Sequence, residues 1–437
     1  MPGKALWKAT HSTTKDRLIQ IFVGFGVSTW MQSPHQTARD MLLAALQIRF
    51  IRASLPGLIP DSSLPAPATT ATLYAAIRTR NGPGNVPLQQ FGAEIARLNI
   101  RLHVIFWNPP APWQKQIGNA VHLADDAHVA DFANYIAAHL LYLRDQSVTP
   151  AAVELTNEPN GVWNTQFTPE QYDQLVFLTR QALDDAGLQA IPIEGPGTSN
   201  RPGDFLRVLR KTGHIKLLGA YSFHEYDSRT GLEPAGLSVI RPALAGLPPL
   251  PIVVTEFSDA APRWQHLAAP YAGRDPSFDP DFGIAVAGEA LQLIADGANE
   301  ILVWHLEDLP WMHGSSGLID RAGNVKPLGQ ALVAVFGLVA PGSQVRIPPH
   351  PVPHTPVVVF QTATEATVCA VNLGTAPVSA RFKIAGLPRL GTRTDRRLFG
   401  GEIGINNDTV ANIQAGSDGV GLYLPPRSSL AALFNLV

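Results

Sequence analysis

Two glutamates of the sequence stand at the ends of apolar runs that read as strands: Glu158 in ELTNEPN and Glu256 in VVTEFSD. Two carboxyl groups about 5 to 5.5 Å apart can cleave a glycosidic bond with retention of configuration, because one protonates the leaving oxygen while the other attacks the anomeric carbon. Pro159 disfavours helix at Glu158, so we expect the chain to leave the strand there and present the carboxyl group. A single such glutamate is more often a solvated loop residue or a helix N-cap partner, so the hypothesis depends on the pair.

Short apolar runs recur through residues 1–344 and supply the strands that position these glutamates. Each run is followed by a polar or Gly/Pro-rich break and then by a helix-like segment, the alternation expected of a parallel β/α fold. Eight strands are predicted, at 21–26, 48–54, 100–107, 151–157, 190–195, 217–226, 251–257 and 300–306. Helical periodicity marks segments between them, among them 92–99, 129–145, 169–187 and 290–297.

This alternation predicts the α/β class and a (β/α)8 TIM barrel over residues 1–344. An open, doubly wound parallel sheet is the alternative. In a barrel, catalytic side chains lie at the carboxyl ends of the strands. Glu158 then ends the fourth strand and Glu256 the seventh, and we expect the two side chains to meet at the mouth of the barrel.

Residues 345–437 have a different texture, with short apolar runs separated by Gly, Pro, Asn and Asp and little helical periodicity. This pattern predicts a C-terminal antiparallel β-sandwich domain. The proline-dense stretch 341–356 is expected to connect the two domains. Its apolar neighbours favour domains that pack against each other.

The runs around the two glutamates resemble strand endings of glycoside hydrolase clan A. ELTNEPNGVWN is similar to the Asn-Glu-Pro signature that ends the fourth strand in that clan, and VVTEFSD is similar to its seventh-strand ending. The resemblance implies that Glu158 is the general acid/base, that Glu256 is the nucleophile and that Asn157 binds the sugar 2-hydroxyl. It also implies a double displacement in which ionised Glu256 attacks while Glu158, protonated at the working pH, donates its proton. Neither a metal nor a cofactor is required.

Other positions match the clan pattern residue by residue. Arg52, near the end of the second predicted strand, resembles the arginine that keeps the nucleophile ionised. His224 and Tyr226 in SFHEYD resemble the sixth-strand pair, in which the tyrosine hydroxyl donates to the nucleophile. Trp304 in LVWHLED resembles the tryptophan that forms a floor under the reacting sugar.

The resemblance spreads over families 39, 30 and 5 of the clan. IFWNPPAPW is similar to a loop of family 30, whereas NEPN followed by Trp163, with the later HEYD, is similar to family 39. A β-sandwich accompanies the barrel in families 30 and 39. Thr156, where many relatives carry a larger residue, and the first twenty residues depart from the pattern, which leaves the substrate range open.

Four tryptophans follow predicted strands: Trp30, Trp107, Trp113 and Trp163. Core packing explains any one of them. As a group near the mouth, they are predicted to stack on the apolar faces of sugar rings. The proline-rich stretch 55–70 is long for a connection, and we expect it to shape access to the cleft.

Composition excludes several classes of function. With 33 Lys and Arg against 35 Asp and Glu, the formal charge is −2, so no net basic field favours nucleic acid or anionic lipid. Cys369 is the only cysteine, which excludes an intrachain disulfide and a zinc site of several thiolates. No GxxxxGK[ST] phosphate loop or GxSxG nucleophile elbow occurs. GFGVST at 24–29 has Thr29 where a dinucleotide-binding turn needs its third glycine, so we read it as a tight turn.

Other acidic residues have structural interpretations. Glu154 lies within a predicted strand, and we expect it to form an ion pair inside the barrel. A group of four residues after the eighth strand lacks the spacing of a known zinc motif and is read as a solvated loop or a sugar-binding rim: His305, Glu307, Asp308 and His313.

The sequence shows no apolar run long enough for a signal peptide or a membrane span, so we expect a cytoplasmic protein, or a secreted or periplasmic one if a native signal has been removed. The expected partner is an oligosaccharide, polysaccharide or glycoside substrate. Two other functions stay open. One is a transglycosylase that uses the same covalent intermediate, and the other is a catalytically inactive carbohydrate-binding protein on the same fold.

Overall fold

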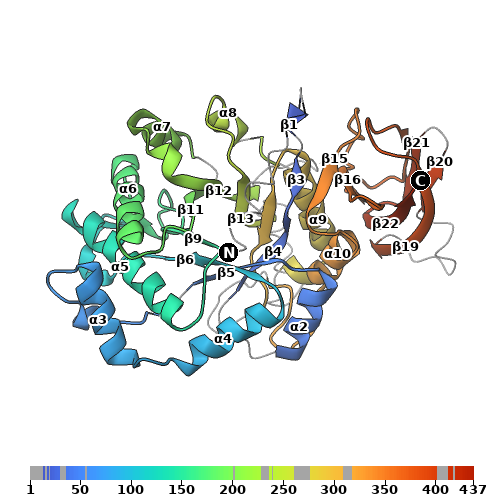
Figure 1. The fold of residues 1–437 in the computed structure, drawn as a ribbon. Helices are drawn as coiled ribbons and strands as arrows, with labels where there is room; N and C mark the ends of the chain where they lie inside the picture. Colours follow the sequence, from blue (N-terminus) through green and yellow to red (C-terminus); the bar gives the residue numbers. More distant parts are fainter. Residues whose placement is uncertain are drawn as a thin grey trace.

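The computed structural model describes residues 13–14, 17–18, 20–29, 36–54, 57–199, 202–227, 236–238, 240–259, 276–308, 317–400, 412–416 and 419–437. Within these ranges, a barrel surrounded by helices forms the larger part of the molecule, and β-sheets at its side form the smaller part, which contains the C-terminus (Figure 1). Among the helices of these ranges, none is both long enough and apolar enough to cross a membrane.

Eight parallel strands close into a barrel, as the sequence predicts, and the alternative of an open sheet is excluded. The strands follow one another round the barrel in chain order, and the last pairs with the first. They are β4 (Gly24–Thr29), β5 (Phe50–Ser54), β6 (Arg101–Ile105), β9 (Ala152–Glu154), β11 (Ile193–Ser199), β12 (Leu218–Asp227), β13 (Ile252–Asp259) and β14 (Glu300–Val303).

The first barrel strand begins later than predicted. β4 covers Gly24–Thr29 and not 21–26, so GFGVST forms a strand and the expected tight turn is wrong. Glycine suits this strand because the neighbouring strand approaches closely: an added Cβ at Gly26 would lie 2.9 Å from the Phe50 side chain. The preceding residues form a separate strand, β3 (Ile21–Phe22), which belongs to another sheet.

Helices lie round the outside of the barrel (Figure 1). They are α2 (Gln36–Ala45), α3 (Thr70–Asn81), α4 (Val86–Arg97), α5 (Ala127–Asp145), α6 (Pro169–Asp185), α7 (Gly203–Thr212), α8 (Arg241–Leu244), α9 (Pro280–Ala295) and α10 (Pro327–Phe336). Helix α6 starts where its sequence dictates, because Thr168 and Gln171 form a reciprocal capping box and Pro169 occupies the first turn. A small sheet beside the barrel contains β7 (Gln114–Ile117), β8 (Ala120–Leu123) and β10 (Thr165–Gln166).

Two antiparallel sheets form the C-terminal part and confirm the predicted β-sandwich. The six-stranded sheet has the order β19-β22-β17-β16-β15-β3, and the three-stranded sheet has the order β18-β21-β20. Val359 and Val368 from the first sheet and Leu422 and Leu424 from the second are buried in one core. The strands are β15 (Ser343–Arg346), β16 (Val357–Gln361), β17 (Glu365–Asn372), β18 (Val378–Phe382), β19 (Leu390–Gly400), β20 (Asn412–Gly416), β21 (Gly419–Leu424) and β22 (Ser428–Leu436).

The six-stranded sheet packs tightly against α9 and α10. Gly288 of α9 lies so close to Leu373 that an added Cβ would be 2.9 Å from its side chain. Cys369 is buried and donates from Sγ to the carbonyl of Val335 at 3.2 Å. Strand β3, just before the barrel, pairs with β15, just after it. The chain therefore enters and leaves the barrel beside this sheet, and the predicted boundary at residue 345 falls inside β15.

Candidate active site

Glu158 lies in the loop after β9, in a backbone conformation that residues other than glycine seldom adopt. Its φ is 42°. Its N–H donates to the carbonyl of Gly197 at 3.1 Å, and its carbonyl accepts from the N–H of Gly161 at 2.7 Å. The side chain is only 4% exposed, and its Oε2 accepts a hydrogen bond from Nε1 of Trp163. The backbone hydrogen bonds with Gly197 and Gly161 thus fix the loop that presents this carboxylate.

Glu256 lies in β13, where a β-bulge redirects the side chains. Glu256 pairs with His224 of β12, whereas Thr255 is skipped in the register. Consecutive strand residues normally point to opposite faces of a sheet, and a bulge relaxes that alternation. Both side chains here point into the barrel, since Thr255 donates to Glu154 at 2.9 Å and Glu256 accepts from Arg52.

Arg52, on β5, connects the endings of the fourth and seventh barrel strands. Its Nη1 donates to Oε1 of Glu256, its Nε donates to Oε2 of Glu154 at 2.8 Å, and its Nη2 donates to Oδ1 of Asn157 at 2.8 Å. Burial lowers the pKa of Arg52, but the charges of Glu154 and Glu256 outweigh burial and raise it. Arg52 is therefore a permanent buried cation in contact with Glu256, as the sequence predicts.

His224 bridges the two glutamates. Its Nδ1 lies 2.8 Å from Oε1 of Glu158 and 3.4 Å from Oε2 of Glu256. Its Nε2 lies 3.3 Å from Nη2 of Arg52, and its Nδ1 donates a hydrogen bond to the carboxylate of Glu158. One ligand atom from each of His224, Glu158 and Glu256 lies within 4.8 Å of the others. The structure thus brings together the glutamates that the sequence pairs.

Hydrogen bonds decide the protonation of Glu158. Burial raises the pKa of this carboxyl, but the hydrogen bond and charge of His224, the hydrogen bond from Trp163 and the charge of Arg52 bring the pKa below its ordinary value. For His224, burial lowers the pKa, and the nearby carboxylates raise it above its ordinary value. These opposite shifts favour an ionised Glu158 beside a protonated His224 in the free protein, opposite to the expectation that burial and a neighbouring charge keep Glu158 protonated.

Aromatic side chains adjoin this group. Tyr226 donates to Oε2 of Glu256 at 2.8 Å, as predicted, and burial together with the charge of Glu256 raises its pKa well above the ordinary value, so the hydroxyl stays a donor. Trp304 is half-buried, and its ring lies edge-to-face with that of Trp107, 5.6 Å between centroids. The guanidinium of Arg52 lies 5.9 Å from the Trp107 ring. Two of the predicted tryptophans therefore form a wall next to Arg52.

The remaining predicted tryptophans differ in environment. Trp163 is 66% exposed and lies beside Glu158, so its ring is accessible to a ligand. Trp113 is only 6% exposed and packs against His128 and Tyr135 of α5, at 5.8 and 6.0 Å between ring centroids. A sugar-stacking role for Trp113 is therefore corrected to core packing, because α5 covers its ring. Trp30 lies outside the described residues.

The other acidic groups fall into two cases. Glu154 forms the predicted ion pair, with Oε2 2.7 Å from Nη2 of Arg52. The residues after β14 are buried and do not form a solvated loop: His305, Glu307 and Asp308 are 1%, 1% and 4% exposed. Asp308 pairs with the buried Lys326 at 2.6 Å, which explains how that loop carboxylate is accommodated. His313 lies outside the described residues.

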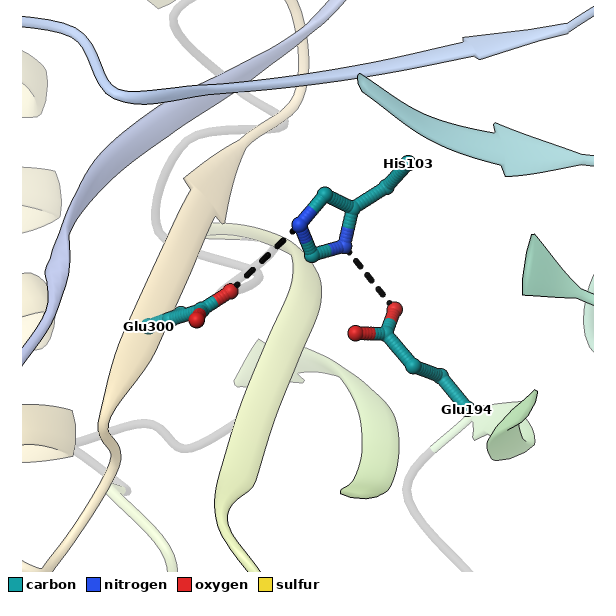
Figure 2. A group of neighbouring side chains, drawn as sticks. All are labelled: His103, Glu194 and Glu300. Carbon is teal, nitrogen blue, oxygen red and sulfur yellow. Dashed lines mark hydrogen bonds and ion pairs between the residues drawn. The ribbon is translucent and has the colours of Figure 1, made fainter. Parts of the chain in front are cut away.

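A second histidine with two glutamates lies inside the barrel, and the sequence analysis missed it. Nδ1 of His103 (β6) lies 2.9 Å from Glu194 (β11), and its Nε2 lies 3.5 Å from Glu300 (β14). Figure 2 shows the imidazole between the two carboxylates, with one nitrogen facing each. This arrangement suits proton sharing more than metal binding, because each nitrogen already faces a carboxylate. The sequence does carry a signal for this group, because His103, Glu194 and Glu300 are polar residues that each lie within an otherwise apolar predicted strand.

The sequence matches no protein-family model and no curated protein sequence. Solved structures do resemble the chain. For a glycoside hydrolase family 30 subfamily 8 xylanase from Clostridium acetobutylicum, the TM-score is 0.69 at 17% identity, over 95% of this chain and 97% of that chain. For a family 39 enzyme from Xanthomonas axonopodis pv. citri, it is 0.59 at 16% identity, over 98% and 96%. For a monomeric β-xylosidase from Caulobacter crescentus, it is 0.59 at 12% identity, over 95% and 96%.

These likenesses extend over both the barrel and the β-sandwich. They confirm the resemblance to clan A families 30 and 39 at the level of the fold. One barrel fold supports many reactions, and the geometry of the site distinguishes among them.

Proposed function

We propose that the protein is a β-glycoside hydrolase that acts with retention of configuration through Glu158 and Glu256. The observation that carries the proposal is the proximity of the two carboxylates, which have oxygens within 4.8 Å of each other. Retaining enzymes hold these groups about 5 to 5.5 Å apart, and inverting enzymes hold them about 6.5 to 9.5 Å apart to admit a water molecule. The short separation supports direct attack by a carboxylate.

The surroundings of each carboxylate support different roles. Glu256 receives hydrogen bonds from Arg52 and Tyr226, which stabilise its ionised form and fix both oxygens, as a nucleophile requires. Glu158 receives hydrogen bonds from His224 and Trp163, and the first of these keeps a proton next to Oε1. Glu158 is therefore the acid/base of the proposed reaction.

The proposed reaction has two displacements. Glu256 attacks the anomeric carbon and forms a glycosyl ester, while the leaving oxygen takes from Glu158 a proton that Glu158 receives from Nδ1 of His224. Glu158 then takes a proton from water, and the water oxygen displaces Glu256 and releases the sugar. Asn157, whose Oδ1 is held by Arg52, keeps its amide nitrogen as a donor for a sugar hydroxyl.

The proposed substrates are β-linked oligosaccharides, polysaccharides or glycosides. Among the proteins with similar folds are xylanases, a β-xylosidase and an endo-β1,6-glucanase, so xylo- and gluco-configured compounds are the first to test. The exposed ring of Trp163 and the half-buried Trp304 offer apolar faces that suit pyranose rings.

A panel of aryl β-glycosides, xylans and β-glucans tests the proposal. The anomer released first is measured by proton NMR before mutarotation. A β-anomer as first product supports retention, whereas an α-anomer overturns it. Transfer to an added sugar acceptor in preference to water would identify a transglycosylase, and binding without turnover of any aryl glycoside would identify an inactive carbohydrate-binding protein.

A further inference from the structure

Glu154 is a buried carboxylate that the proposed reaction does not use. It ends β9, is 1% exposed and accepts hydrogen bonds from side chains of three other strands. Nε of Arg52 donates to Oε2 at 2.8 Å, and Ser222 and Thr255 donate to Oε1 at 2.8 and 2.9 Å. Each partner is a side chain inside the barrel, and Glu154 is closed off from solvent, so it offers no surface to a substrate.

The backbone around Glu154 is shaped to admit it. Gly197 of β11 has φ of 64°, and an added Cβ there would lie 2.5 Å from Oε1 of Glu154. Thr255 reaches the same oxygen only because the bulge in β13 turns its side chain inward. Two irregularities on different strands therefore converge on one carboxylate.

Glu154 determines how Arg52 meets Glu256. A guanidinium carries five donors in one plane, and Glu154 binds the Nε and Nη2 edge. Only Nη1 is then directed to Glu256, while Nη2 also donates to Asn157. A guanidinium bound on one edge by a fixed carboxylate cannot rotate away from the nucleophile.

Glu154 also offsets the charge of Arg52. Two carboxylates, Glu154 and Glu256, contact this single cation, so one negative charge remains to hold a proton on the neighbouring pair of His224 and Glu158. The charges of Glu154 and His224 interact directly through the protein interior. Loss of the Glu154 charge would therefore favour release of that proton.

We propose that Glu154 is a positioning residue for the reaction: held by Ser222 and Thr255, it fixes the guanidinium of Arg52 against the nucleophile and keeps a proton available to the acid/base. This inference rests on the proposed function. It assigns to Glu154 an effect on both the rate and the pH dependence of catalysis, which a purely structural ion pair would not have.

The variant Glu154→Gln tests the proposal, with Glu194→Gln as matched control. Glu194 is the register partner of Glu154 on β11 and is equally buried, but it bonds His103. For Glu154→Gln we expect kcat to fall about 100-fold with little change in KM, because misplacement of a reacting group costs about that much. The basic limb of the pH profile of kcat/KM should move to lower pH. Glu194→Gln should leave both unchanged.

An unchanged kcat and pH profile in folded Glu154→Gln, or the same changes in Glu194→Gln, would overturn the proposal. If Glu154→Gln does not fold, the double variant Ser222→Ala with Thr255→Val can replace it. This variant keeps the charge of Glu154 but removes the two hydroxyl donors that fix its carboxylate. That variant should lower kcat several-fold without moving the basic limb of the pH profile of kcat/KM. A wild-type kcat would refute the positioning role.

A second readout separates this proposal from the proposed function. Carbon-13 NMR of labelled glutamate side chains follows the titration of Glu158 with no substrate present. Its midpoint should be lower in Glu154→Gln than in the wild type, even if the wild-type protein hydrolyses no glycoside. An unmoved midpoint contradicts the charge argument, whereas absent hydrolysis with a moved midpoint contradicts only the proposed function.

Discussion

The barrel contains two groups of the same composition in different surroundings. The mouth group is Glu158, His224 and Glu256, and the base group is His103, Glu194 and Glu300; each has one histidine and two glutamates, all buried. Donors surround the mouth group, from Arg52, Tyr226 and Trp163. In the base group, shown in Figure 2, Oε1 of Glu194 and Oε2 of Glu300 have no hydrogen-bond donor among the described residues, and Oε2 of Glu300 faces Nε2 of His103 only as an ion pair at 3.5 Å.

This difference changes the charge that each group carries. In the mouth group, hydrogen bonds and Arg52 outweigh burial, and the pKa of Glu158 lies below its ordinary value. In the base group, burial outweighs the attraction of His103 and Arg101 and raises the pKa of Glu300 to about 7. Identical residue types thus give a charged group suited to reaction in one place and a proton-holding group in the other.

Glu256→Ala is the strongest test of the assignment of the reaction to the mouth group. We expect kcat to fall by about 10⁴-fold or more, because the attacking atom is gone. Added azide should restore turnover and give a glycosyl azide of inverted configuration. The measurement is steady-state kinetics with NMR analysis of the product. Activity retained by Glu256→Ala, or covalent labelling of another residue by a 2-fluoro glycosyl inhibitor, would contradict the assignment.

The effect of Glu158→Ala on kcat/KM should depend on the leaving group of the substrate. For glycosides with alkoxide or sugar leaving groups, we expect kcat/KM to fall about 10²- to 10⁴-fold, the usual contribution of general acid catalysis. For activated aryl leaving groups, the first displacement should be nearly unaffected. The plot of log kcat/KM against leaving-group pKa should therefore become steeper. Equal losses across the series would argue against an acid role.

Glu300→Gln should change stability and leave activity alone. Because the folded pKa of Glu300 is about 7 against an ordinary 4.5, the folded state retains a proton that the unfolded state has released between these values. The free energy of unfolding of the wild type therefore falls as pH rises from about 4.5 to about 7, by about 3 kcal/mol at 1.36 kcal/mol per pKa unit.

Chemical denaturation across this pH range should show a flatter dependence for Glu300→Gln, with kcat as in the wild type. Nearby charges raise the pKa of His103 despite burial, so its stabilisation is present below its ordinary pKa of 6.5 and is lost as pH rises through the higher folded value. A slope that the substitution does not alter would show that the base group holds no excess proton.

Trp163→Phe should give the smallest effect. The substitution removes the indole N–H that lowers the pKa of Glu158 and keeps an aromatic face. Activity requires the proton that His224 and Glu158 hold between them and falls as pH rises and this proton is lost. A higher pKa of Glu158 should therefore move the basic limb of kcat/KM to higher pH. We expect a change in kcat of about tenfold or less, consistent with the net contribution of about 0.5 to 1.5 kcal/mol from one hydrogen bond. A limb that moves to lower pH would contradict this account.

Much of the fold was predictable because periodicity reflects burial. Apolar runs predicted all eight barrel strands, and the capping box at Thr168 set the start of α6. The start of β4 was not predictable, because Ile21 and Phe22 are as strand-like as the residues after them. Only pairing with β15, more than three hundred residues later, assigns them to the other domain.

For the site, the order of residues along the chain was enough to place the reacting side chains at strand endings: Asn157, Glu158 and Glu256, with Arg52 and His224 nearby. The tertiary structure alone decided which donors reach each carboxylate and hence the charge each carries. The bulge at Thr255 and the turn at Glu158 are set by contacts between strands, and burial is a property of the closed barrel. The same closure turned Trp113 into a core residue and made Glu154 the partner of Arg52, because side-chain environment depends on residues distant in the chain.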